Sequence, residues 1–118
     1  MVIGVYWSPE VLDHKLEPLD QPGRGPIEGV WNCRHLPQGL GKDEVGDYMF
    51  VASQGFWRGC LRLVPEVLYS PEDPSCSYTL IFDVRSWKAV DTPVARSRFR
   101  GWTYDVPDAV VRPALAGR

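Results

Sequence analysis

Short hydrophobic runs, interrupted by glycine and proline, cover most of the chain and predict strands rather than long helices. These runs are rich in β-branched and aromatic residues. They span residues 2–7, 27–34, 48–53, 56–68 and 78–90, and residues 96–104 add a further short strand. Gln54-Gly55 separates two of the runs, which predicts that residues 48–53 and 56–64 pair as an antiparallel hairpin and that residues 78–84 join the same curved sheet.

Two short helices complete the predicted elements. Ser8 stands directly before Pro9, a combination typical of a helix start because serine caps the first turn and proline fits the first helical position. This helix should end near Pro18, and it should place three apolar side chains inward: Val11, Leu12 and Leu16. Residues 107–115 predict a second helical turn.

Composition narrows the fold class. Glycine and proline together make up 22 of the 118 residues, which excludes an all-helical bundle because both residues break helices. The length suits one domain, residues 1–118, with a core of its own. We therefore predict a mainly β (α+β) fold, a small barrel-like sheet of five to six strands with one or two short helices.

Charge and cysteine usage limit the partners and the compartment. A net charge of −2 disfavours a long basic groove for nucleic acid, although a local basic patch remains compatible with it. No run of 18 apolar residues is present, so no membrane partner is expected, and residues 1–7 lack the pattern of a secretion signal. Cys33, Cys60 and Cys76 form an odd set without a CxxC pair, which indicates thiols in a reducing cytoplasm, with Cys60 buried.

Catalytic and metal-binding motifs do not emerge from the sequence. Val51 occupies the first glycine position that a nucleophile elbow needs, and residues 22–26 lack the glycine spacing of a dinucleotide-binding loop. Cys33 and His35 would share one face of a strand, but no further ligand pair has the spacing of a zinc site. No metal, cofactor or catalytic residue is therefore predicted from these motifs.

Arginine and aromatic residues supply the one functional signal. Arg96, Arg98 and Arg100 alternate, so an extended backbone would place them on one face, and Trp102 and Tyr104 continue the same alternation. Arginine beside exposed aromatic rings is what base stacking and phosphate contact require. The alternative is a solvated sheet face whose arginines pair with carboxylates while the tryptophans fill the core.

Three segments together resemble the PUA-like superfamily, particularly its EVE and ASCH branches. They are GVWNCR at residues 29–34, VGDYMFV at 45–51 and GFWRGCLRLV at 55–64, and an opening strand that ends in Tyr6-Trp7 is similar to the start of EVE domains. The resemblance implies a PUA-like pseudo-barrel with a pocket for a single base, often a modified one, in RNA or DNA. By position it implies that four residues border this pocket: Trp7, Trp31, Asn32 and Arg34. The alternating arginines 96, 98 and 100 would then contact the flanking phosphates.

Two other functions stay open. Some ASCH-branch proteins look like small amidohydrolases that act on modified nucleosides through a lysine, a hydroxyl and a carboxylate. Candidates for such a group are Lys42 with Glu44, or Lys88 with Thr92 and Asp91. A protein-interaction domain is the third alternative, because tryptophan, tyrosine and arginine also dominate interface hot spots. A concave site with aromatic walls favours base binding, whereas a flat aromatic patch favours a protein partner.

Overall fold

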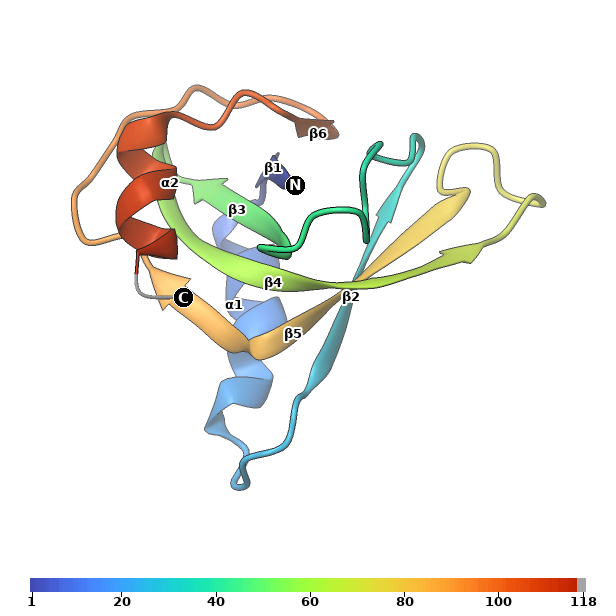
Figure 1. The fold of residues 1–118 in the computed structure, drawn as a ribbon, viewed down its shortest axis with the longest axis horizontal. Coiled ribbons are helices and arrows are strands. Elements are labelled where there is room, and N and C mark those ends of the chain that lie inside the picture. Colours follow the sequence, from blue (N-terminus) through green and yellow to red (C-terminus); the bar gives the residue numbers. More distant parts are fainter. Residues whose placement is uncertain (117–118) are drawn as a thin grey trace.

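A computed structural model describes residues 1–116 as a six-stranded sheet with two short helices and one 3-10 turn (Figure 1). The strands are β1 (Val2–Tyr6), β2 (Glu28–Cys33), β3 (Asp47–Ser53), β4 (Phe56–Tyr69), β5 (Tyr78–Ala89) and β6 (Trp102–Thr103). The helices are α1 (Pro9–Leu16), the 3-10 turn η1 (Glu17–Asp20) and α2 (Asp108–Leu115). The predicted mainly β class is therefore confirmed.

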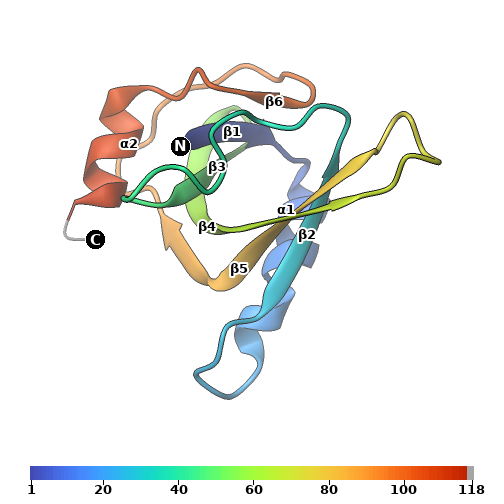
Figure 2. The ribbon, with the colours of Figure 1, turned by 45° about the vertical axis from the view of Figure 1, so that its right-hand side comes forward.

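The sheet has the strand order β2-β5-β4-β3-β1-β6 and curls into a half-barrel (Figures 1 and 2). All neighbouring strands are antiparallel except β1 and β3, which run parallel. The pairing of β4 with β5 shifts register twice, between Cys60 and Arg62 and between Leu63 and Val67. Because such irregularities bend a strand and increase its twist, the 14-residue β4 can run through the whole curve of the sheet.

A two-residue turn joins β3 to β4, as the sequence predicts. Gln54 and Gly55 both have positive φ, 52° and 86°, which is the backbone pattern of a type I′ hairpin turn. Ser53 therefore lies opposite Phe56. The residues from 78 onward also join the same sheet, so the predicted three-strand arrangement is confirmed.

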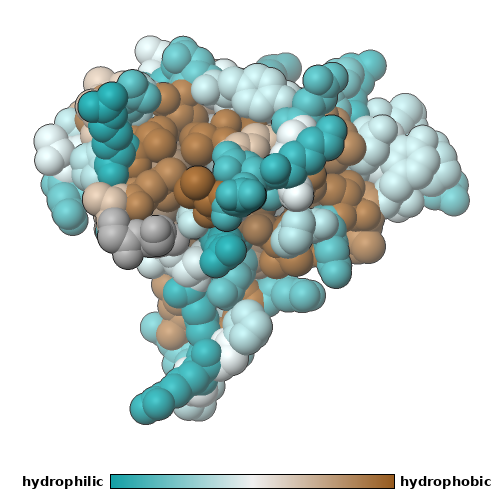
Figure 3. Space-filling model, in the orientation of Figure 1, coloured by the Kyte–Doolittle hydropathy of each residue, from teal (hydrophilic) through white to brown (hydrophobic). Residues whose placement is uncertain are grey.

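Each face of the sheet is covered by a separate apolar core. Alternate residues of β3 contribute to the two cores, which explains why its five central residues, 48–52, are buried. The polar residues at its ends, Asp47 and Ser53, are buried as well. Leu12 and Leu16 of α1 pack against the first core, and Val110 and Ala114 of α2 are buried in the second. On the face shown in Figure 3, apolar side chains gather beside α2, while the projecting end of the β4–β5 hairpin is paler and more polar.

The N-terminal helix begins as predicted. The Ser8 hydroxyl accepts a hydrogen bond from the Val11 amide at 3.3 Å, and Pro9 occupies the first helical position. The prediction for Val11 is wrong, however, because its side chain is 39% exposed. Leu12 and Leu16 are four residues apart and so share the face that packs on the sheet, whereas Val11 is turned away from it.

The predicted strand over residues 96–104 is also wrong for most of its length, since only Trp102 and Thr103 pair, with β1. Upstream, an isolated bridge joins Ala95 to Phe56, and the Arg96 amide donates to the Gly55 carbonyl at 2.8 Å. Side-chain packing holds the rest of this segment. The Phe99 ring packs edge-on against Tyr6 with centroids 5.8 Å apart, and the Arg96 guanidinium lies 4.5 Å above the Phe99 ring. Gly101 has a φ of 69°, a left-handed conformation that interrupts an extended backbone just before β6.

Candidate functional site

A hollow of about 710 Å³ opens where three segments distant in sequence meet. The segments are residues 34–38 after β2, the projecting end of the β4–β5 hairpin, and the chain at β6. The lining residues are Arg34, His35, Leu36, Gln38, Tyr69, Ser77, Tyr78, Trp102 and Tyr104. Two different elements supply aromatic side chains to this hollow, which is broad and open to solvent.

One wall belongs to the hairpin. Tyr69 ends β4 and Tyr78 begins β5, and the two residues face each other as the last cross-strand pair of the hairpin. Their ring centroids are 5.1 Å apart with planes inclined by 34°. Tyr78 also pairs with Cys33, the last residue of β2, which places the hairpin end beside residues 34–38. Tyr69 remains 60% exposed, so its ring is accessible to a ligand.

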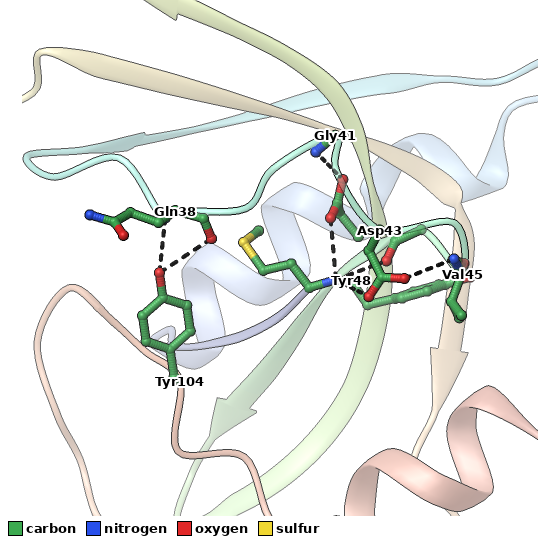
Figure 4. Close-up of polar contacts among 9 residues, drawn as sticks. Gln38, Gly41, Asp43, Val45, Tyr48 and Tyr104 are labelled. Carbon is green, nitrogen blue, oxygen red and sulfur yellow. Dashed lines mark hydrogen bonds and ion pairs between the residues drawn. The ribbon is translucent and has the colours of Figure 1, made fainter.

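The second aromatic pair of the lining lies at β6, where the rings of Trp102 and Tyr104 meet edge to face with centroids 4.7 Å apart. The Trp102 indole N–H donates to the His35 carbonyl at 2.7 Å. The Tyr104 hydroxyl accepts from the Gln38 amide at 2.9 Å and donates to the Gln38 carbonyl at 3.4 Å (Figure 4). Hydrogen bonds thus hold the polar ends of both aromatic side chains to residues 35–38. These bonds fix the positions of the two rings before any ligand binds.

A second hollow of about 320 Å³ adjoins the first and shares Arg34, His35 and Trp102 with it. Its other lining residues are Cys33, Arg100 and Gly101. None of the described residues that line either hollow is acidic, whereas the lining includes two arginines. The pair of hollows therefore favours an anionic ligand, although the whole chain is slightly acidic.

The structure brings together some of the residues predicted from sequence and separates others. Arg34 lines both hollows, and Arg100 lines the second. Trp7 is 4% exposed and packs on Phe82 in the first core, and Trp31 packs partly buried against the same core. Neither tryptophan is among the lining residues of the two hollows.

Asn32 lies on the other face of β2 from Trp31, because neighbouring residues of a strand point in opposite directions. Its side-chain oxygen accepts a hydrogen bond from the Thr79 hydroxyl across the strand pair at 2.7 Å. The side chains of Trp31 and Asn32 therefore do not converge on one site in this structure.

Arg96 and Arg98 lie outside both hollows. Arg96 forms an ion pair with Asp105 at 3.2 Å, in addition to its contact with the Phe99 ring, so its guanidinium is engaged in the fold. Arg98 is exposed. Since residues 96–100 are not a strand, the three arginines are not arranged on one sheet face, and only Arg100 approaches the aromatic hollow.

The two lysine groups considered for amidohydrolysis lie elsewhere. Lys42 and Glu44 are exposed in the loop before β3. Lys88, Asp91 and Thr92 do line a common pocket, of about 130 Å³, against α2. There the Lys88 amino group donates to the Ala114 carbonyl at 3.2 Å and lies 3.4 Å from that of Pro113, so it holds the end of the helix.

Sequence reasoning identified Trp102 and Tyr104 as part of an aromatic face but missed Tyr69, Tyr78 and His35 as members of the site. The signal that could have found the tyrosines is the pairing of the hairpin ends, since residues 69 and 78 flank the turn-rich segment 70–77. His35 was considered only beside Cys33 as part of a metal site, and nothing in the sequence indicated that it would line an aromatic hollow.

In comparisons with known proteins, the chain matches no family model, no curated protein and no solved structure. Over residues 1–116, no helix is long and apolar enough to cross a bilayer. Within the same residues, no three histidine, cysteine, aspartate or glutamate side chains are grouped so that they could hold a metal ion.

The three thiols differ in surroundings and should differ in reactivity. Cys60 is fully buried, as predicted, and Cys76 is the more accessible of the other two. Burial, with a smaller contribution from the charge of nearby Cys76, raises the pKa of Cys33 to about 11. Because the thiolate is the reactive form, Cys33 should resist alkylation at neutral pH.

We expect iodoacetamide at pH 8 to modify Cys76 first in the native protein, with Cys33 and Cys60 reacting only on unfolding, as measured by peptide mass spectrometry. Since the pKa of Cys33 is higher in the folded chain than in the unfolded one, its contribution to stability should be lost as the pH rises towards about 11. The control variant Cys33→Ser lacks the thiol, so it should not show this loss of stability at high pH. Labelling of native Cys33 as fast as Cys76 would contradict the account.

Proposed function

We propose that the chain is a nucleic-acid-binding module that recognises a single base in RNA or DNA. The base would stack in the hollow between the hairpin tyrosines, Tyr69 and Tyr78, and the β6 aromatics, Trp102 and Tyr104. The observation that carries the proposal is the presence of aromatic rings from two different elements in the lining of one open hollow. The resemblance of residues 29–34, 45–51 and 55–64 to the PUA-like superfamily supports the same kind of ligand.

The energetics of stacking suit this arrangement. A base that stacks on an aromatic side chain gains about 1–3 kcal/mol, and every base has a face with which to do so. Trp102 and Tyr104 are held by their hydrogen bonds to His35 and Gln38, so little side-chain entropy remains to be lost on binding. An unpaired or flipped base would also leave its edge open for hydrogen bonds, which could come from Gln38 or Ser77.

A single-base pocket is compatible with the acidic composition. Proteins that bind long stretches of nucleic acid need a basic surface, because phosphate neutralisation supplies much of their affinity. A site that holds one nucleotide needs only a few cations at the pocket itself. Arg34 and Arg100 are in the appropriate place, and no acidic residue among those described lines either hollow.

The test is nucleoside binding by Tyr69→Ala, with Leu68→Ala as the matched control. Leu68 and Tyr69 are adjacent and similarly exposed, 57% and 60%, but only Tyr69 lines the hollow. In titrations with a panel of common and modified nucleosides, followed by NMR, Tyr69→Ala should weaken binding by about 5- to 150-fold. Leu68→Ala should bind as the wild type does. Equal affinities of the two variants would contradict the proposed pocket, and no binding by the wild type would favour a protein-interaction domain.

A further inference from the structure

The second hollow lies directly beside the aromatic hollow. It is lined by residues at the end of β2 and at the beginning of β6. Arg34, His35 and Trp102 line both hollows. Trp102 is fixed at this boundary by its hydrogen bond to the His35 carbonyl. A ligand that stacks on the aromatic wall would therefore extend directly into the second hollow.

Two arginines line the second hollow, and neither is paired with a carboxylate among the described residues. Arg34 and Arg100 are exposed, and neither forms an ion pair within the part of the chain that the structure describes. Arg96, by contrast, is paired with Asp105, and Arg112 lies near Asp108. Two like charges beside one hollow, with no carboxylate in its lining, are suited to an anion, because a guanidinium can offer two parallel N–H donors to phosphate oxygens.

The backbone at Gly101 leaves room for such a group. A Cβ atom at this position would meet nothing within 4 Å, and the positive φ is one that glycine adopts without strain. A ligand can therefore approach the main chain closely between Arg100 and Trp102.

We propose that Arg34 and Arg100 form a phosphate subsite next to the base hollow, so that the ligand is a nucleotide rather than a nucleoside. This inference rests on the proposed function. Arg34, which touches both hollows, holds the phosphate on the side of the base, and Arg100 holds it from the β6 side. Arg98, although exposed and only two residues away, has no part in the subsite.

The test compares a nucleoside, its monophosphate and inorganic phosphate as ligands of the wild type and of three variants. The variants are Arg34→Gln, Arg100→Gln and the matched control Arg98→Gln. We expect the monophosphate to bind about tenfold or more tightly than the nucleoside, with a salt dependence that the nucleoside lacks. Arg34→Gln and Arg100→Gln should each remove most of this gain, whereas Arg98→Gln should retain it and leave nucleoside affinity unchanged. A short single-stranded oligonucleotide that binds more tightly than the free monophosphate would place the nucleotide within a strand.

The outcomes separate the subsite from the proposed function. If nucleoside and monophosphate bind equally well, or if Arg98→Gln abolishes the gain as effectively as Arg100→Gln, the phosphate subsite is wrong while base binding stands. If inorganic phosphate binds in a manner dependent on Arg34 and Arg100 but no nucleoside binds, the subsite stands and the base pocket is wrong. Binding of none of the three ligands overturns both.

Discussion

Replacement of Trp7 by alanine is expected to lower the free energy of unfolding by about 3–5 kcal/mol, the usual cost of removing a buried tryptophan from a core. Trp7 is 4% exposed and lies against Phe82, with ring centroids 5.9 Å apart. Its indole N–H is buried without a hydrogen-bond partner among the described residues. Phenylalanine in its place keeps most of the apolar contact and removes this unpaired donor, so Trp7→Phe should be much less destabilised than Trp7→Ala.

The variants Trp7→Ala and Trp7→Phe also show whether Trp7 only stabilises the core or also binds the base. Chemical denaturation measures the stability of both variants, and nucleoside titration measures binding by the folded Trp7→Phe protein. We expect that affinity to equal that of the wild type. A folded Trp7→Phe variant that no longer binds a base would instead return Trp7 to the pocket, as the resemblance to EVE domains implies.

Replacement of Trp102 by alanine should have the largest effect on binding of any single aromatic change. The variant loses a stacking surface, worth about 1–3 kcal/mol, and releases the hydrogen bond that fixes the loop at His35. The two losses together should lower the affinity for a base by about 12- to 2,000-fold. Trp102→Phe keeps a ring but lacks the indole N–H, so it should lose less, about 2- to 12-fold for one hydrogen bond.

Isothermal titration calorimetry of the two Trp102 variants with the tightest-binding nucleotide measures both changes in affinity. Circular dichroism and thermal unfolding establish that each variant is folded, which matters because β6 pairs with β1 at this point. A folded Trp102→Ala protein with unchanged affinity would show that the β6 wall does not contact the base.

Much of the sheet could be predicted because its signals are local. Gln54-Gly55 specifies a tight hairpin turn by its tolerance of positive φ, and Ser8-Pro9 specifies a helix start by capping chemistry. The strand predicted over residues 96–104 was wrong for the opposite reason, because contacts between distant residues shape this segment. Its alternation of arginines is compatible with a strand, but the segment is held by contacts with residues far apart in the sequence, among them Phe99 with Tyr6 and the Arg96 amide with the Gly55 carbonyl.

The sequence indicated which types of residue the candidate site would contain, but not which individual residues would form it. Arg34 and Arg100 each carried a sequence signal, yet nothing local indicated that they would border one hollow. Tyr69 and Tyr78 join the site only through the register of β4 with β5, which shifts twice along its length. Trp31 followed by Asn32 looks like a binding motif in the sequence, but strand geometry sends the two side chains to opposite faces.

The five tryptophans provide the most direct test of the central claim, that a base stacks at the β6 wall. Each indole N–H gives its own signal in a nitrogen-15 correlation spectrum, and the variants Trp7→Phe, Trp31→Phe and Trp102→Phe assign the three signals of interest. On titration with a nucleotide, we predict that the Trp102 signal shifts in proportion to binding while the signals of Trp7 and Trp31 stay in place. A spectrum in which the Trp31 signal moves and the Trp102 signal does not would contradict the account and place the ligand at the pocket predicted from sequence.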